Sequence, residues 1–372
     1  SDSGKIDIIN DDIKETMISQ TIESAQNQQE GTGIQQDQDM TSIVSDIIVN
    51  TDTDTGSKII EELNNSASDN DLSLQVISGI SEKDTEKLNT LSENNKEQID
   101  TLTQSAIKNA GSSQESAELI AKVVANASDD FANQIIGEVT KNSTDENQAL
   151  SAKVMKSIVE TNPDKIENLN DENKNNLISQ TIEAAKNQAE GTSSDELDLS
   201  NTIAQIVTNS DTGTAAKVLE SLDEATKGSD SKLSLSVVSN LTKQENYEEK
   251  MEILSVTSSI VEQNITKLIE KAVESASTEE DLKILTNIVE NSKGTIADKV
   301  INSANTNEES KKKISEVIVN VVEKNPEKAI EIIEKNKNTN AVLETVKTKI
   351  EKGEAVSTDD FEEVFDTNVS PN

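Results

Sequence analysis

The stretch NTDTDTGSKIIEE combines residue types and spacings that could bind a calcium ion. Asn50, Asp52 and Asp54 alternate along the chain as the oxygen ligands of an EF-hand loop do. Glu61 stands at the twelfth position, where such a loop places a carboxylate. The loop also requires glycine at its sixth position, whereas Gly56 is at the seventh. These four oxygen-bearing residues are therefore weak calcium candidates.

Related segments elsewhere in the chain lack the full ligand pattern. The segment NSDTGTAAKVLE, residues 209–220, has Gly213 where the fifth-position ligand belongs. The segments ENSKGTIADK and EKNPEKAIEI lose nearly all the carboxylates. All of them contain residues that end one helix and cap the next. We interpret the stretch as a turn between two helices, and a specific calcium site is the alternative.

The composition excludes many kinds of active site. The chain has 372 residues, no His, no Cys and no Trp, and it contains no Arg. Catalytic triads, Cys–His pairs, common zinc sites and disulfides therefore cannot form. A bidentate arginine clamp for phosphate is also excluded. We expect a protein that is not an enzyme and has no cofactor and no small-molecule substrate.

The charge of the chain limits its partners. The formal net charge is -37 at pH 7. Nucleic acids and anionic lipids need positive charge on their protein partners, so neither is an expected partner. No run of 18 apolar residues is present, which argues against membrane insertion. The chain itself, as a homopolymer, or another protein remains the expected partner.

Two long segments of the sequence repeat each other. DDIKETMISQTIESAQNQQEGTG (11–33) returns as DENKNNLISQTIEAAKNQAEGTS (171–193), with ISQTIE identical in both. NTDTDTGSKIIEEL (50–63) pairs with NSDTGTAAKVLESL (209–222), and LSLQVISGIS (72–81) pairs with LSLSVVSNLT (233–242). These matches predict an internal duplication of about 160 residues.

A third, loosely similar segment begins near the end of the chain. EKNKNTNAVLETVKTKIEKGEAVS (334–357) aligns with the start of each copy. Either this segment is a degenerate capping repeat, or the sequence is part of a longer array of repeats. We divide the chain into an N-terminal extension (1–10), a first helical array (11–170), a second array (171–334), and a truncated third copy or cap (335–372).

Shorter units within each copy have the pattern of a helix, a turn and a second helix. In TAAKVLESL, four apolar residues lie at i, i+3, i+4 and i+7, which is one face of a helix. Pro163 and Pro326 each follow Asn and open a segment, as is typical of the first turn of a helix. Short helices are marginal alone but bury a continuous core when stacked. The predicted fold is an all-α solenoid.

The last residues contain a short apolar stripe. Phe361, Val364 and Phe365 lie at helical spacing behind a possible Ser357 or Thr358 cap. One interpretation is that this segment folds back and covers the last repeat. The other is that it docks into another subunit, which makes the three residues assembly candidates.

The units resemble those of α-helical solenoid proteins of the HEAT and TPR kind. The segment AAKVLESLD (215–223) is locally similar to the superhelical amino-terminal domain of bacterial magnesium transporters and to flagellar motor-switch superhelices. The aromatic residues of the TPR consensus are absent. The resemblance implies an architecture and carries over no catalytic or ligand-binding residue.

We therefore expect a structural repeat protein, a subunit of an extracellular or cell-surface filament or matrix that assembles by head-to-tail helical contacts. The alternative is an acidic adaptor that binds a protein or peptide on its concave face. A cytoplasmic location is the alternative to the cell surface. A hydrolase that uses paired carboxylates is a third and weaker hypothesis.

Overall fold

The structure, a computed structural model, describes residues 11–29, 39–66, 72–110, 113–191, 197–227, 232–245, 247–257, 259–292, 294–336 and 341–366. All regular secondary structure in these ranges is helical. This confirms the predicted all-α fold. None of the helices found there is both long and apolar enough to cross a membrane.

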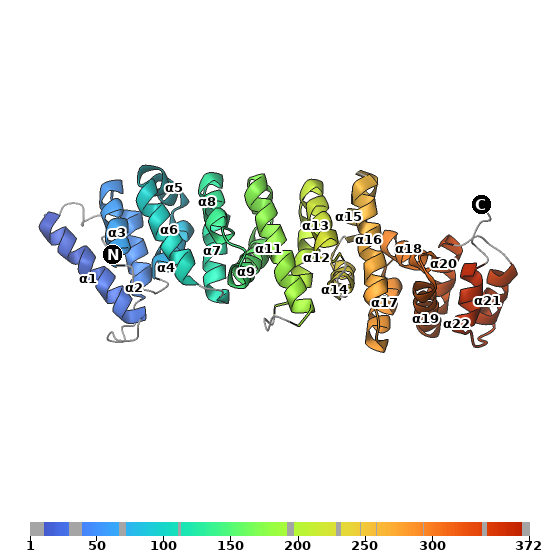
Figure 1. The fold of residues 1–372 in the computed structure, drawn as a ribbon. Helices are drawn as coiled ribbons and strands as arrows, with labels where there is room; N and C mark the ends of the chain where they lie inside the picture. Colours follow the sequence, from blue (N-terminus) through green and yellow to red (C-terminus); the bar gives the residue numbers. More distant parts are fainter. Residues whose placement is uncertain are drawn as a thin grey trace. The chain divides into compact units, whose positions relative to one another are not determined.

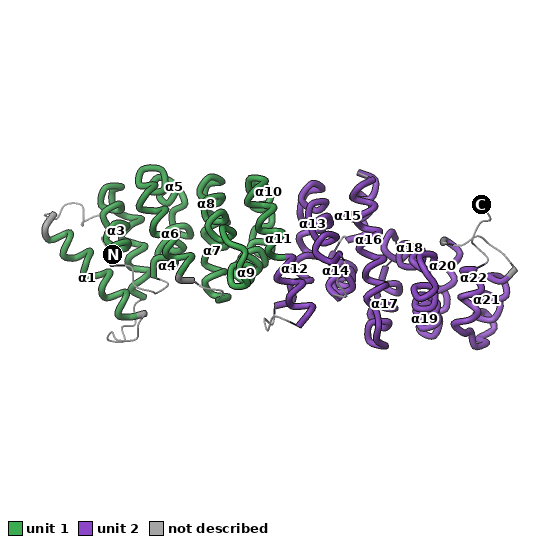
Figure 2. The backbone as a smooth tube through the Cα atoms, viewed as in Figure 1, with its two compact units in different colours: residues 1–181 green, residues 182–372 purple. Residues whose placement is uncertain are grey.

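The chain forms two compact units, residues 1–181 and 182–372 (Figure 2). The division falls within helix α11, Asp171–Ala189, slightly after the boundary at 170/171 that the sequence suggests.

The described residues of unit 1 form a succession of helices (Figure 1). They are α1 Asp11–Gln29, α2 Met40–Asn50, α3 Thr53–Ser66, α4 Leu72–Lys83, α5 Thr85–Asn94, α6 Lys96–Ala110, α7 Gln114–Asn126, α8 Asp129–Val139, α9 Asp145–Thr161 and the short α10 Asp164–Glu167. Two rows of stacked helices result, because α2, α4, α7 and α9 contact one another in succession, and so do α3, α6 and α8.

Unit 2 repeats this arrangement. Its helices are α12 Leu199–Asn209, α13 Thr212–Ala225, α14 Leu233–Leu241, α15 Tyr247–Thr257, α16 Ser259–Ser275, α17 Glu279–Asn291, α18 Thr295–Asn302, the 3₁₀ helix η2 Ser303–Asn305, α19 Glu308–Lys324, α20 Pro326–Asn336, α21 Ala341–Glu351 and α22 Thr358–Asp366. Helices α12, α14, α17 and α19 form one row, and α13, α16, α18 and α20 form the other. Each unit is an α-solenoid.

The core of both units consists of aliphatic side chains. Ile, Leu, Val and Ala dominate the buried positions, and Phe131 and Phe361 are among the few buried rings. Small polar residues are also buried where helices approach closely. Ser45, which is fully buried, donates a hydrogen bond to the carbonyl oxygen of Val76 on α4, and Gly79 of α4 packs directly against its side chain. Small residues such as Ser45 and Gly79 let the axes of α2 and α4 come close together, which keeps a core of aliphatic side chains closely packed.

Matched blocks of the sequence form helices of equal length. Helices α1 and α11 both have 19 residues, α2 and α12 both have 11, and α3 and α13 both have 14. A corresponding glutamine contacts the start of the following helix in both copies: Gln28 Oε1 accepts from Met40 N at 2.8 Å, and Gln188 Oε1 accepts from Leu199 N at 3.4 Å. The duplication itself stays a prediction from the sequence.

Candidate functional site

Several turns between helices carry networks of polar contacts. Three of them share one form, in which Asn ends a helix, the next residue is its C-cap, and the third caps the start of the following helix. The three turns are Asn50–Thr51–Asp52, Asn126–Ala127–Ser128 and Asn209–Ser210–Asp211. Asp52, Ser128 and Asp211 each accept a hydrogen bond from a backbone N–H in the first turn of the next helix, as N-caps do.

A lysine from a later helix binds each of these turns. Its Nζ donates a hydrogen bond to the backbone carbonyl oxygen of the C-cap residue. The pairs are Lys87–Thr51 at 2.6 Å, Lys165–Ala127 at 2.7 Å, and Lys250–Ser210. The last carbonyls of a helix have no partner within the helix and carry partial negative charge, so an ammonium group is well suited to bind them.

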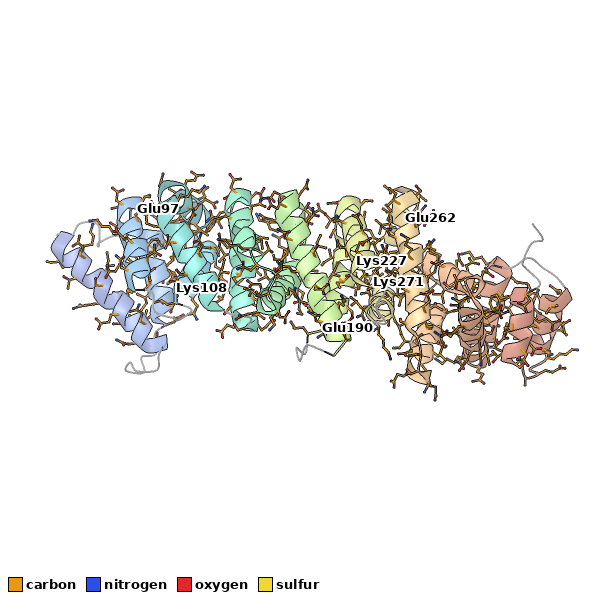
Figure 3. The ribbon with its side chains drawn as sticks, viewed as in Figure 1. Glu97, Lys108, Glu190, Lys227, Glu262 and Lys271 are labelled. Carbon is orange, nitrogen blue, oxygen red and sulfur yellow. The ribbon has the colours of Figure 1, made fainter. Side chains whose placement is uncertain are left out.

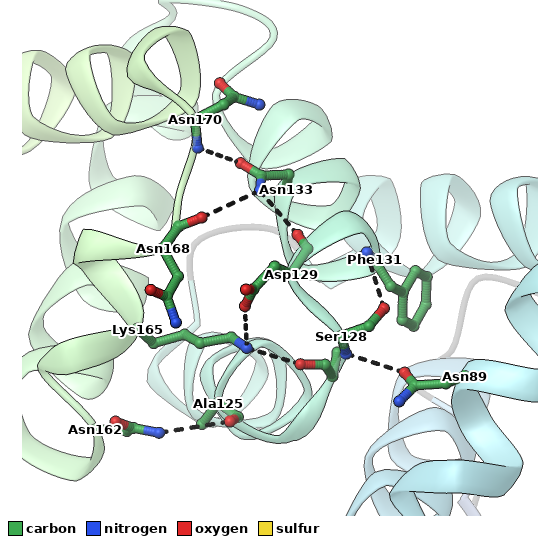
Figure 4. Close-up of polar contacts among 11 residues, drawn as sticks. Asn89, Ala125, Ser128, Asp129, Phe131, Asn133, Asn162, Lys165, Asn168 and Asn170 are labelled. Carbon is green, nitrogen blue, oxygen red and sulfur yellow. Dashed lines mark hydrogen bonds and ion pairs between the residues drawn. The ribbon is translucent and has the colours of Figure 1, made fainter.

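Lys165 makes the most enclosed of these contacts. Its side chain is only 10% exposed, and Nζ also lies 2.9 Å from Oδ1 of Asp129. Figure 4 shows both contacts converging on the ammonium group. A buried charge is tolerated where its hydrogen bonds are satisfied, and Lys165 thereby joins α10 to the turn between α7 and α8.

Asparagine amides extend the network from turn to turn (Figure 4). Asn133 of α8 donates through Nδ2 to the carbonyl oxygens of Asp129, at 2.8 Å, and Asn168, at 3.5 Å. Its Oδ1 accepts from the backbone N–H of Asn170 at 2.7 Å. Asn89 Oδ1 accepts from the N–H of Ser128 at 2.9 Å, so α5 is also joined to this turn. One amide can bridge two hairpins because it both donates and accepts.

The calcium candidates occupy one of these turns. Asn50 is the last residue of α2, and its Nδ2 donates to the carbonyl oxygen of Asp46 at 2.8 Å. Asp52 Oδ1 accepts from Thr55 N at 2.7 Å and so caps α3. Asp54 and Glu61 both lie within α3, in its first turn and further along the helix. The residues that an EF-hand would fold as a twelve-residue loop are therefore mostly helical.

The same carboxylates are not gathered around a common point. Among the residues described, no three acidic side chains are placed to hold one metal ion. Asp52 has a structural role as a cap, and Glu61 lies beside Glu62 and Lys58 along the side of α3 that faces α1. Specific calcium binding stays an untested alternative.

The assembly candidates are enclosed by unit 2. Phe361, Val364 and Phe365 are all 2% exposed or less, and α22 contacts α19 and α21. Two ion pairs fasten the helix, Lys311 Nζ to Asp366 Oδ1 and Lys349 Nζ to Asp360 Oδ1, both at 2.6 Å. This is the fold-back arrangement. A direct contact of the three side chains with another subunit would require α22 to leave α19.

Asp281 is a buried carboxylate held in its charged form. It is 3% exposed, and it accepts from the backbone N–H of Ser277 at 3.0 Å and of Thr278 at 2.9 Å. Burial alone raises its pKa, but the hydrogen bond from Lys232 and those from Ser277 and Thr278 outweigh burial and lower the pKa to about 2. The carboxylate is therefore ionised at neutral pH and completes the capping box of α17.

Asp223 is a second carboxylate with a lowered pKa. Burial opposes the shift, and the hydrogen bond and charge of Lys271, followed by those of Lys267, produce it. Lys271 Nζ is 2.7 Å from Asp223 Oδ1 and also donates to the carbonyl oxygen of Asp223. A general acid needs a raised pKa, so both carboxylates are suited to holding helices together and unsuited to donating protons.

Sequence reasoning identified the turns but missed the lysines that bind them. Lys87, Lys165 and Lys250 stand in segments that read as ordinary charged helix faces. The duplication could have pointed to two of these lysines. Lys87 precedes the buried pair Leu88 and Leu91, and Lys250 precedes the corresponding buried pair Met251 and Leu254. Two groups of exposed aliphatic residues were also missed: Ile13 and Met17 on α1, and Ile253, Val256 and Ile260 on α15 and α16.

Comparison with known proteins adds little to this description. No protein-family model matches the chain, and no curated protein matches it. One solved structure, described as a circular tandem repeat protein with novel repeat topology and enhanced subunit contact surfaces, is similar at 15% sequence identity and a TM-score of 0.32. The similarity covers 96% of this chain and 88% of that chain. The assignment of the solenoid fold rests on the stacked helices themselves.

Proposed function

We propose that this chain is a non-enzymatic structural subunit of an extracellular or cell-surface filament or matrix, which assembles through head-to-tail helical contacts. Stacked helices provide length, and several lysines and buried carboxylates join one hairpin to the next. The net charge of -37 keeps neighbouring arrays soluble and apart. The lowered pKa values of Asp223 and Asp281 support a structural role for these carboxylates.

The outer face of α1 carries the proposal. Ile13 is 55% exposed and Met17 is 43% exposed, although both are large apolar residues. Gln20, one helical turn further, is exposed as well. These three residues lie at i, i+4 and i+7 and form one stripe, which we call the α1 stripe.

The matching stripe of α11 shows what such a face binds. In the sequence match, Asn173, Leu177 and Gln180 correspond to the α1 stripe, and all three are buried within unit 1. Gln180 Nε2 donates to the carbonyl oxygens of Thr140, at 2.8 Å, and Asn142, at 3.0 Å. The stripe of α11 therefore packs on a helical hairpin of unit 1. We propose that the α1 stripe packs in the same way on a hairpin that belongs to a second copy of the chain.

The test is mass photometry of the purified protein over a range of concentration and salt. The double variant Ile13→Glu, Met17→Glu should lose chains longer than the monomer. The double variant Val256→Glu, Ile260→Glu is the matched control, because it also adds two carboxylates at exposed apolar residues far along the sequence. Equal loss in both variants, or a wild-type protein that stays monomeric in every condition, would overturn head-to-tail assembly through α1.

Helix α22 is the other candidate contact and can be separated from α1. Removal of residues 357–372 should leave assembly intact if the α1 stripe is the contact. Loss of assembly on this deletion, with the α1 double variant still assembling, would assign the contact to Phe361, Val364 and Phe365. The location is tested separately by immunogold microscopy of intact cells, where label confined to the cell interior would overturn a surface role.

A further inference from the structure

Three aliphatic side chains project into solvent where α15 is followed by α16. Val256 is 80% exposed, Ile260 is 67% exposed and Ile253 is 44% exposed. Ile253 and Val256 lie at i and i+3 in the last turns of α15, and Ile260 lies in the first turn of α16. We call these three residues the apolar corner. Single exposed aliphatic residues are common on protein surfaces, whereas several in one short stretch of the chain make a candidate interaction site.

Burial of other residues explains why the corner is not part of the core. The inner face of α15 consists of Tyr247, Met251 and Leu254, which are all buried. Ile253 and Val256 lie on the other side of the helix, so the core of unit 2 is complete without them. The stability of α15 therefore does not account for their apolar character.

The matching corner of unit 1 is polar. Lys87 and Lys250 make the same contact with a C-cap carbonyl, which fixes the alignment of α5 with α15. Leu102 and Ile265, which are both buried, have the same separation in sequence as Lys87 and Lys250, and this aligns α6 with α16. On this alignment Thr90, Glu93 and Glu97 take the places of Ile253, Val256 and Ile260.

The comparison shows that the fold does not require aliphatic residues at these places. Glu93 and Glu97 are exposed, as their counterparts are. A polar corner is the ordinary solution for a helix end in water, and unit 1 adopts it. The apolar corner of unit 2 is therefore a local feature of the surface and not a consequence of the solenoid architecture.

Acidic side chains border the apolar corner. Glu249 and Glu252 lie one turn before Ile253 and Val256 and are exposed. Glu262 follows Ile260 on α16, where Figure 3 shows it toward the upper end of the helix, and it is already paired with Lys299 Nζ at 3.6 Å. The ammonium group of Lys250 is engaged with the carbonyl oxygen of Ser210. The corner thus offers an apolar centre within a negative rim.

We propose that the apolar corner is the docking site for a basic amphipathic helical segment of another protein. Aliphatic residues of that segment would cover Ile253, Val256 and Ile260, and its Lys or Arg residues would pair with Glu249 and Glu252. A second copy of this chain fits this acidic rim less well than it fits the uncharged α1 stripe, because the chain has 71 acidic residues against 34 basic ones. This inference is independent of the proposed filament.

The test uses a synthetic helical peptide with a leucine face and a lysine face, and fluorescence anisotropy as the measure of binding. The triple variant Ile253→Thr, Val256→Glu, Ile260→Glu places the unit 1 residues at the corner. We expect it to bind the peptide about tenfold more weakly or worse, because the loss of 1.4 kcal/mol or more of apolar contact corresponds to that factor. Since the variant is also more acidic, equal or tighter binding would show a purely electrostatic attraction and overturn the proposal.

The reverse variant keeps the test independent of any damage to unit 2. Thr90→Ile, Glu93→Val, Glu97→Ile builds the apolar residues on α5 and α6, where Glu86 corresponds to Glu249 but Asn89 stands in the place of Glu252. The number of bound peptides per chain should rise by one, and the added site should bind more weakly than the apolar corner. Circular dichroism melting checks that both variants fold. No binding of the peptide to the wild-type chain would overturn the proposal. So would concentration-dependent dimers that the first variant abolishes, since a second copy would then be the occupant.

Discussion

The carboxylate of Asp281 lies 2.9 Å from the ammonium nitrogen of Lys232, although the two residues are 49 positions apart. The contact joins the start of α14 to the start of α17 in unit 2. Because Asp281 also accepts backbone hydrogen bonds, its charged form is favoured more strongly in the folded state than in the unfolded one.

Acid should therefore remove the contribution of Asp281 to stability. Its pKa falls from 3.8 to about 2 on folding, so its contribution is present above pH 3.8 and is lost as the pH falls through the folded value. We expect Asp281→Asn to lower the free energy of unfolding by about 2 kcal/mol at pH 7 and by much less near pH 2. Urea unfolding across this pH range measures the difference. A difference that does not shrink with acid would contradict the assignment, and Glu279→Gln, at an exposed site on the same helix, is the control.

Lys165 should contribute more to stability than a surface lysine does. The variant Lys165→Met keeps the length of the side chain but leaves the carbonyl oxygen of Ala127 without its charged donor. The expected loss is about 1.5–3 kcal/mol in urea unfolding. Lys156→Met is the matched control, because Lys156 pairs with Glu160 at i, i+4 along one helix, and such pairs contribute about 0.5 kcal/mol. Equal effects of the two variants would show that the turn contact adds nothing.

Removal of the Phe361 ring should loosen α22. The ring is fully buried, and its replacement by Ala should cost about 3–5 kcal/mol of local stability. Hydrogen exchange of the α22 amides should rise far more than exchange in α14, which lies elsewhere in unit 2. Phe361→Leu, which keeps most of the apolar volume, should restore most of the protection. Unchanged exchange in Phe361→Ala would mean that α22 is not held by this side chain.

Gly79 should not tolerate a larger residue. A methyl group there would meet the side chain of Ser45, which is itself buried between α2 and α4. We expect Gly79→Ala to destabilise the protein by about 1–3 kcal/mol, despite the gain in helix propensity. At Gly56, also within a helix, a methyl group would reach Leu91 at 3.4 Å and make ordinary contact. Gly56→Ala should therefore be neutral or stabilising. Thermal unfolding of the two variants and of the wild-type protein measures both effects.

The sequence was most informative where the pattern is local. Helix α13 could be placed because Ala215, Val218, Leu219 and Leu222 form a clear apolar face, and all four are buried. Pro326 is the first residue of α20, as expected, whereas Pro163 takes the N-cap position just before α10. The spacing of apolar residues determines which face of a helix is apolar, and a helix with one apolar face is expected to pack against neighbouring helices.

Contacts between distant residues could not be read in the same way. Nothing near Lys87 in the sequence indicates that its ammonium group reaches Thr51 of an earlier hairpin. The stripe of Phe361, Val364 and Phe365 could also be predicted as apolar without showing what covers it, and the structure places it against α19 and α21. Spacing along the chain specifies a face, whereas the identity of its neighbour depends on the tertiary arrangement.

Binding of lysine to a backbone carbonyl has a consequence for the evolution of the chain. A carbonyl oxygen is present whatever the side chain, so the residue that receives the lysine can change without loss of the contact. Thr51, Ala127 and Ser210 illustrate this, because three different residue types receive the same kind of hydrogen bond. Only the lysine and the position of the turn need to be retained. Lineages of such repeats can therefore drift far apart in sequence while each hairpin still recognises the next.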